Sequence, residues 1–128
     1  MNPSMIPVSL LNALEKFVER RGHAEGLSEM ELLRRLVAER GGDPALLEAE
    51  DPTAAFPYLV EAMEVSLLER AAANWPELFL KGTSDIDGEG LDYRIALLDR
   101  LSRLMPGEVG MELGLVHRFL QASASQDA

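Results

Sequence analysis

The sequence predicts an all-α fold, a single-domain irregular bundle of about six short-to-medium helices. Leucine and alanine, which favour helices, supply 22 and 15 of the 128 residues, whereas the β-branched strand former isoleucine occurs three times. Apolar residues recur at three- and four-residue spacing, and no segment has the pattern of a strand. Short connections join these amphipathic segments, which is typical of helical bundles.

The first two helices have recognisable ends. Residues 8–21 carry an apolar stripe, and Gly22 follows it as a stop signal. A second helix is expected over residues 28–41, because Ser28 and Glu31 have the spacing of a capping box.

A short third helix and a long fourth one are expected in the middle of the chain. Asp43 and Pro44 have the residue types of an N-cap and a first helical position, so a helix over residues 44–50 follows from them. The segment from about 55 to 74 is apolar on two sides. A helix of this kind usually contacts neighbours on both faces, so we expect a long central helix there.

The last third of the chain completes the prediction. The expected elements are a short helical turn over residues 75–80 that closes at Gly82, and helices over residues 91–105 and 107–122. The domain is expected to cover residues 1–122, with a disordered tail over 123–128. The predicted core comprises Leu14, Phe17, Leu33, Leu36, Val60, Met63, Leu67, Leu98, Leu101, Val116 and Leu120.

The net charge of −10 arises entirely in the middle of the sequence. Residues 42–93 hold twelve acidic side chains against Arg70 and Lys81, whereas residues 1–41 and 94–128 each sum to zero. We call residues 42–93 the acidic belt. Such a belt repels nucleic acid and anionic membranes and attracts basic surfaces, so neither nucleic acid nor membrane is an expected partner.

Several kinds of protein are disfavoured by composition. Cysteine is absent, so the chain has neither a disulfide framework nor a thiolate site. No segment approaches the ~20 apolar residues that span a bilayer. These features favour a soluble cytoplasmic protein.

The sequence therefore favours a non-enzymatic interaction protein that needs no cofactor. It would be an adaptor, an inhibitor, or an antitoxin-like or immunity-like regulatory protein that binds a basic surface of another protein. Its charges would steer the encounter, and apolar residues near them would supply most of the affinity. The residues expected to contact this partner are Glu48, Glu50, Asp51, Phe56, Tyr58, Glu61 and Glu64.

An enzymatic alternative depends on two pairs of carboxylates. Glu61 and Glu64 are three residues apart, as are Glu89 and Asp92, and carboxylates at this spacing share a helix face. Such pairs can hold Mg²⁺ against a triphosphate. The pattern resembles the acidic motifs of the all-α, MazG-like nucleotide pyrophosphohydrolases, although Val60 stands where those proteins usually have a further Glu. The resemblance implies a divalent-metal-dependent nucleotide hydrolase.

The last predicted helix contains two glycines one turn apart. Each glycine inside a helix costs up to ~1 kcal/mol relative to alanine, so Gly110 and Gly114 need a structural reason. Together with the neighbouring His117 they form a smooth strip that another helix can approach closely. The strip is expected to serve either a tight crossing within the chain or a homodimer contact.

Overall fold

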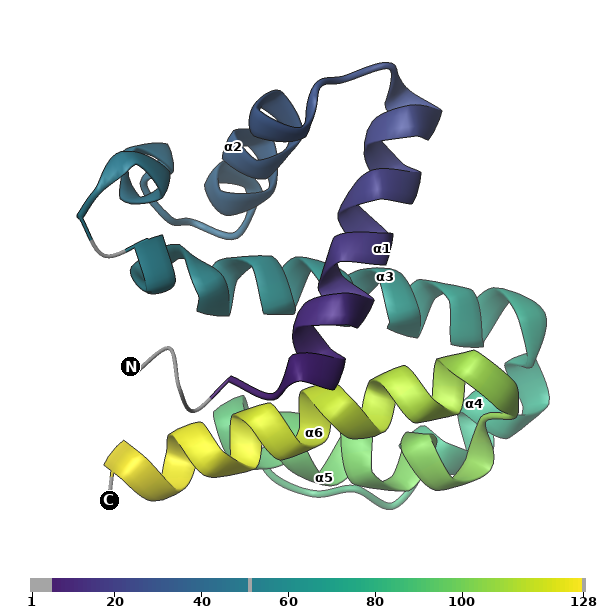
Figure 1. Cartoon of the computed structure of the whole chain (residues 1–128). Coiled ribbons are helices and arrows are strands. Elements are labelled where there is room, and N and C mark those ends of the chain that lie inside the picture. Colours follow the sequence, from purple (N-terminus) through teal and green to yellow (C-terminus); the bar gives the residue numbers. More distant parts are fainter. Residues whose placement is uncertain (1–5, 51, 128) are drawn as a thin grey trace. The chain divides into compact units, whose positions relative to one another are not determined.

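The computed structural model describes residues 6–50 and 52–127, which form six α-helices, two 3-10 helices and no strand. The predicted all-α fold is therefore confirmed (Figure 1). The chain divides into two compact units, Met1–Val65 and Ser66–Ala128, and each is described by itself. The expected single domain over residues 1–122 stays a prediction.

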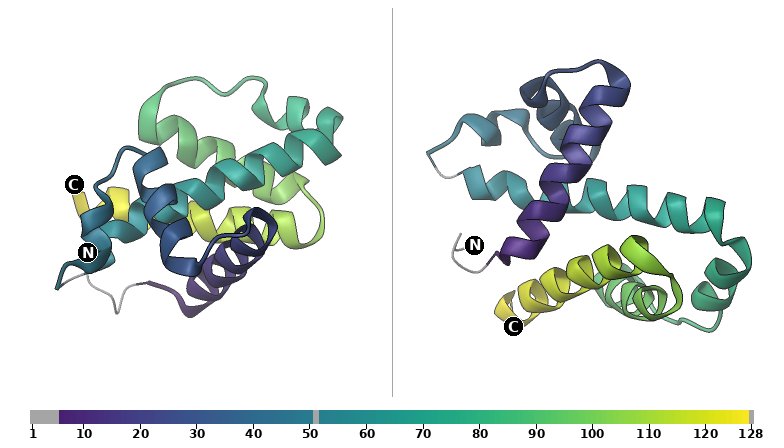
Figure 2. Two further views of the ribbon diagram at one scale, coloured as in Figure 1. Left: turned by 90° about the horizontal axis from the view of Figure 1, so that it is seen from above. Right: turned by 45° about the vertical axis from the view of Figure 1, so that its right-hand side comes forward.

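The first unit contains two helices followed by short helical turns. Its elements are α1 (Val8–Glu25), α2 (Glu29–Glu39), the 3-10 helices η2 (Pro44–Glu48) and η3 (Pro52–Ala55), and the first ten residues of α3 (Phe56–Asn74). Elements that follow one another in the chain also pack together: α1 contacts α2, α2 contacts η2, and η2 contacts η3. In Figure 2, α2 folds back beside the C-terminal half of α1.

Helix α1 continues past the predicted stop at Gly22. It ends instead at Gly26, whose left-handed φ of 67° suits glycine and whose N–H donates to the carbonyl oxygen of Gly22. Gly22 is buried inside the helix, and a Cβ added there would lie 3.3 Å from the carbonyl oxygen of Leu27 and 3.5 Å from Leu32 of α2. Its missing side chain therefore leaves room for the turn that follows α1.

The start of α2 is capped as predicted. The hydroxyl oxygen of Ser28 accepts a hydrogen bond from the backbone N–H of Glu31 at 3.2 Å and donates one to the Glu31 carboxylate at 2.9 Å. The predicted core of α2 is wrong at one position, however. Leu33 is half-buried, so its place in the predicted core is wrong, and Leu32 is fully buried beside Leu36.

The predicted helix over residues 44–50 is a shorter 3-10 helix. The Asp43 carboxylate accepts from the N–H of Ala45 at 2.9 Å, so the predicted N-cap is confirmed. The N–H of Leu46 donates to the carbonyl of Asp43, three residues back, which is the pairing of a 3-10 helix. The N–H of Ala49 likewise donates to the carbonyl of Leu46, three residues back.

The second unit holds the rest of α3, then α4 (Pro76–Thr83), α5 (Gly90–Leu104) and α6 (Gly107–Asp127). Helices α5 and α6 run side by side (Figures 1 and 2). At 21 residues α6 is longer than the 19-residue α3, and it extends five residues beyond its predicted end. The central position of α3 stays a prediction.

Gly82 lies inside α4 and does not end it as predicted. A Cβ added to Gly82 would meet Leu101 of α5 at 2.5 Å and Leu104 at 3.1 Å. The absent side chain therefore lets α4 pack directly on α5. Between the two helices, Arg100 of α5 donates a hydrogen bond to the carbonyl of Ser84 at 2.8 Å and fastens the end of α4.

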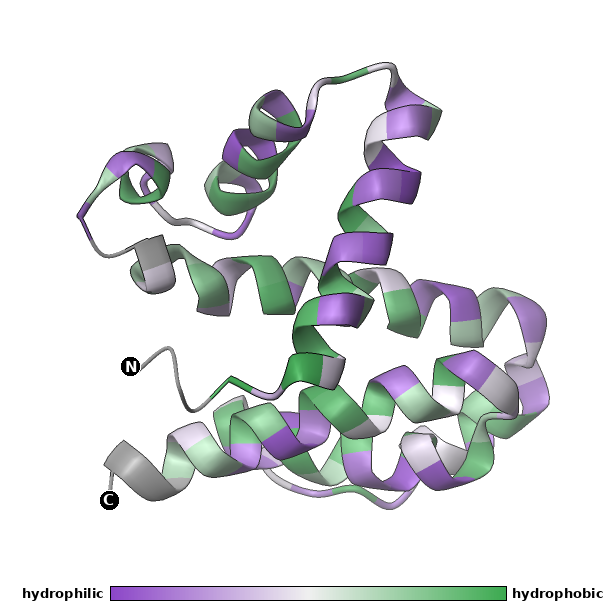
Figure 3. Ribbon diagram, viewed as in Figure 1, coloured by the Kyte–Doolittle hydropathy of each residue, from purple (hydrophilic) through white to green (hydrophobic). Residues whose placement is uncertain are grey.

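The predicted core is otherwise confirmed, because the remaining ten residues are all buried. Figure 3 shows that α1 begins with hydrophobic residues and becomes mostly hydrophilic toward its C-terminal end. None of the helices within the described residues combines the length and the apolar composition that crossing a bilayer requires.

Candidate interaction surface

The first part of the acidic belt lies beside Arg34 of α2 and Arg40, the residue that follows α2. Arg34 forms an ion pair with Glu48, and Arg40 forms one with Glu61 at 3.7 Å. Two of the predicted partner-binding carboxylates are thus partly compensated by arginines that precede the belt in sequence. Glu50 is exposed, whereas Asp51 lies outside the described residues.

The apolar residues predicted to anchor a partner are held by the fold. Phe56 is buried at the start of α3, and Tyr58 is half-buried against Gly42. A Cβ added to Gly42 would lie 2.9 Å from Cδ2 of Tyr58, so the glycine makes room for this ring. Glu64 is also buried. The acidic belt therefore exposes fewer uncompensated carboxylates and less aromatic surface to a partner than its sequence suggests.

The four carboxylates of the predicted magnesium site are divided equally between the two units. Glu61 and Glu64 belong to the first unit, whereas Glu89 and Asp92 are exposed at the start of α5 in the second. Among residues 6–50 and 52–127, no three side chains of the His, Cys, Asp and Glu types come together as a metal-binding group. The Mg²⁺-dependent reading stays a prediction.

The glycine strip of α6 faces the end of α5. A Cβ added to Gly110 would lie 2.2 Å from the carbonyl oxygen of Met105, and one added to Gly114 would lie 3.8 Å from Cβ of Ser102. His117, one turn farther along, is half-buried. The close approach of the Met105 carbonyl explains why position 110 is a glycine without any contact to a second chain. A homodimer contact along the strip stays a prediction.

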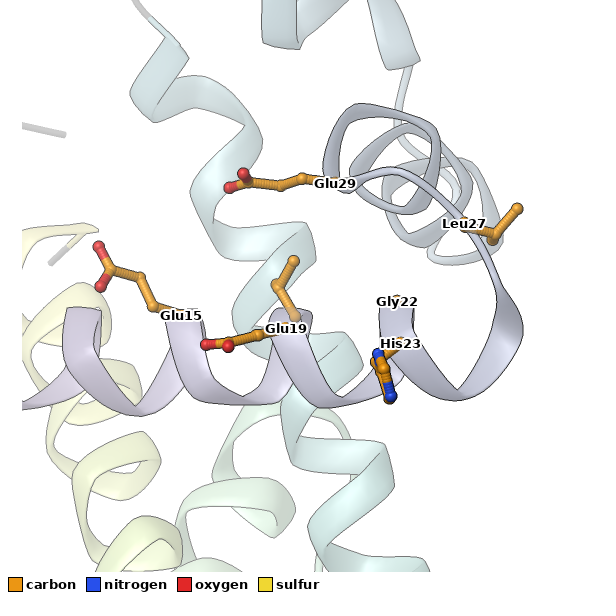
Figure 4. Close-up of a pocket in the computed structure, with 7 residues that line it drawn as sticks. Glu15, Glu19, Gly22, His23, Leu27 and Glu29 are labelled. Carbon is orange, nitrogen blue, oxygen red and sulfur yellow. The ribbon is translucent and has the colours of Figure 1, made fainter.

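The first unit has a second acidic surface, a hollow of about 500 Å³ between α1 and α2. Its lining residues are Glu15, Val18, Glu19, Gly22, His23, Leu27 and Glu29. Figure 4 shows Glu29 extending from the start of α2 above Glu15 and Glu19 on α1, with His23 farther along α1. We call this hollow the α1–α2 groove. Three carboxylates surround it, and Val18 and Leu27 are the large apolar residues among its lining residues.

The carboxylates of the α1–α2 groove carry uncompensated charge. In the part of the chain that the structure describes, Arg21 and Arg35 both form ion pairs with Glu25, at 3.1 and 3.6 Å, and none of the ion pairs includes a groove carboxylate. Glu15, Glu19 and Glu29 are all exposed. A positively charged group can reach them without displacing an existing partner.

The summed charge of residues 1–41 does not reveal this groove, because opposite charges cancel in the sum. Residues 1–41 sum to zero, but Arg21 pairs with Glu25 at 3.1 Å and Arg20 donates to the carbonyl of Lys16 at 3.3 Å. The signal was the four-residue spacing of Glu15, Glu19 and His23, which puts all three on one helix face.

Comparison with known proteins returns no relative: no family model, curated protein or solved structure matches this chain. The geometry of the described residues is therefore the basis for any functional proposal.

Proposed function

We propose that this chain is a small protein-interaction module that binds a basic surface of a partner protein through the α1–α2 groove. The observation that carries the proposal is the set of three unpaired carboxylates around an apolar-lined hollow of about 500 Å³. A lysine or arginine fits both parts of this site, because its aliphatic stem packs on apolar surface while its charged end reaches a carboxylate.

The overall charge supports the same kind of partner. The first unit holds twelve acidic and six basic side chains, which gives it a net charge of −6. A field of this sign accelerates encounter with basic surfaces and becomes weaker as salt is added. The acidic belt contributes to this field, but its ion pairs with Arg34 and Arg40 make it a weaker contact site than the groove.

A titration with a defined basic probe tests the proposal. Hexalysine added to the isotope-labelled full chain is expected to shift the amide signals of the second half of α1 and the start of α2, and hexaglutamate is expected to shift none. Binding should weaken between 0.05 and 0.3 M salt, because exposed charges are increasingly screened over this range.

Two matched pairs of substitutions locate the binding site. Glu15→Gln with Glu19→Gln removes two groove charges and should weaken hexalysine binding by about two- to thirtyfold, since each exposed ion pair contributes ~0.2–1 kcal/mol. Glu48→Gln with Glu50→Gln removes the same charge from the belt and should leave the amide shifts at the groove in place. If Glu48→Gln with Glu50→Gln abolishes hexalysine binding and the groove substitutions do not, the binding site lies on the acidic belt. That result would refute the proposal that the groove binds the partner.

A further inference from the structure

Exposed apolar side chains extend the α1–α2 groove along α1. Val8 is 71% exposed and Leu11 is 37% exposed, although α1 buries most of its other large apolar residues. Met30, at 46% exposure, follows the groove residue Glu29 in α2. A simple cation site needs carboxylates alone, whereas this acidic groove also has exposed apolar side chains at its end.

These residues share one face of α1. Val8, Leu11, Glu15 and Glu19 follow one another at spacings of three and four residues, which places them in a line along the helix. The line is about 17 Å long at 1.5 Å per residue. Its first turn is apolar and its later turns are acidic, in agreement with the change of hydropathy along α1 in Figure 3. We call this line the α1 face.

We propose that the partner segment bound by the α1 face is a basic amphipathic helix of about three turns. This inference rests on the proposed function, because it assumes that the groove carboxylates contact the partner. The apolar residues of the bound helix cover Val8 and Leu11, and its lysines or arginines reach Glu15, Glu19 and Glu29. Its charge and apolar pattern are thus the complement of the α1 face.

A helix suits this face better than an extended peptide does. The side chains on one face of a bound helix recur every turn, about 5.4 Å. This spacing matches that of α1 residues three to four positions apart, so contacts can repeat along the whole α1 face. Same-side residues of an extended chain recur about every 6.6 Å and lose this register within three turns. A helix seated in an apolar groove with charged margins is also a recurrent mode of peptide recognition.

Two synthetic peptides of identical composition test the inference. Both contain fourteen residues of leucine, lysine, alanine and glutamine. In one, leucines and lysines form a single helix face, apolar at one end and basic at the other; in the other, the same residues are permuted so that no face forms. Calorimetric titration of the full chain at 0.15 M salt should show at least tenfold tighter binding of the amphipathic peptide.

Substitutions then identify the surface responsible. Val8→Ala with Leu11→Ala should abolish most of the difference in affinity between the amphipathic and the permuted peptide. Binding of the permuted peptide and of hexalysine should be unchanged. Leu80→Ala is the matched control, because Leu80 is 68% exposed on α4 of the second unit and should have no effect. Circular dichroism melting checks that the variants are folded, and the comparison of the two peptides on the unmodified chain needs no variant.

The outcomes separate the two proposals. Equal binding of both peptides, with hexalysine still mapped to the groove, would overturn the helical partner and leave the proposed function standing. If hexalysine does not bind the unmodified chain, the proposed function itself is overturned. A dimer in sedimentation that Val8→Ala with Leu11→Ala dissociates would show that a second copy covers the α1 face, and it would overturn the basic helix.

Discussion

Alanine at Gly110 and alanine at Gly114 are expected to change stability in opposite directions. The two glycines lie one turn apart on α6, but their surroundings differ. A Cβ at 110 would lie 2.2 Å from the carbonyl oxygen of Met105 and 3.1 Å from that of Ser102, whereas a Cβ at 114 would meet Cβ of Ser102 at 3.8 Å. The first contact is too short to exist, and the second is ordinary van der Waals contact.

The expected magnitudes follow from these distances. Alanine is more favourable than glycine inside a helix by about 1 kcal/mol, so Gly114→Ala should raise the free energy of unfolding by roughly that amount. At Gly110 the obstacle is a backbone oxygen, which has no rotamer to change, so the start of α6 must shift. Overpacking of this kind costs about 1–3 kcal/mol or more, which exceeds the gain in helix propensity. After subtraction of that gain, Gly110→Ala should lower the free energy of unfolding by up to about 2 kcal/mol.

Urea unfolding followed by far-ultraviolet circular dichroism measures both changes. The midpoints should move in opposite directions with similar slopes, and the melting temperature should shift by about 4 °C per kcal/mol for a chain of this size. An increase in stability for both variants would refute the argument, because it would show that α6 does not begin this close to the end of α5. Sedimentation of the same variants tests the homodimer prediction, since a dimer seated on the strip should dissociate when Gly114 becomes alanine.

Three further predictions concern the core, a helix cap and the enzymatic alternative. Met63→Ala should lower the free energy of unfolding by about 2–5 kcal/mol because Met63 is fully buried, and a urea-unfolding loss below ~1 kcal/mol would contradict its place in the core. Ser28→Ala should cost about 1 kcal/mol in the same assay because it removes the acceptor for the N–H of Glu31, and an unchanged midpoint would show that this cap contributes nothing. If the chain hydrolyses nucleotides, a screen of nucleoside triphosphates with Mg²⁺ or Mn²⁺ should show turnover that Glu61→Gln abolishes; no turnover by the unmodified chain would remove support for that reading.

Local signals in the sequence predicted the helices well, because each depends on a few neighbouring residues. The capping pair of Ser28 and Glu31 and the N-cap at Asp43 both act within three residues, and both were confirmed. The glycines were harder. Gly22 and Gly82 have the residue type of a helix end, but α1 continues to Glu25 and α4 to Thr83, and each glycine leaves room for a neighbouring segment. A glycine that stops a helix and one that admits a neighbour look alike in sequence.

The candidate site was harder to predict than the fold, because charge in sequence is not charge in space. The belt contains no base between Arg40 and Arg70, yet Arg34 and Arg40 pair with Glu48 and Glu61 of the belt. Such pairs depend on how α2 packs beside the segment that follows it. The α1–α2 groove was hard to predict for the opposite reason, because its carboxylates belong to residues 1–41, whose charges sum to zero.

The contact between Gly42 and Tyr58 has a consequence for how this protein can vary during evolution. A Cβ at position 42 would lie 2.8 Å from Cγ1 of Val37 and 2.9 Å from Cδ2 of Tyr58, so position 42 is coupled to both side chains. A homologue with a residue larger than glycine at 42 is expected to carry smaller residues at both 37 and 58. Such correlated replacement would leave a covariation signal among these positions, and that signal would link the turn after α2 to α3 in any alignment deep enough to detect it.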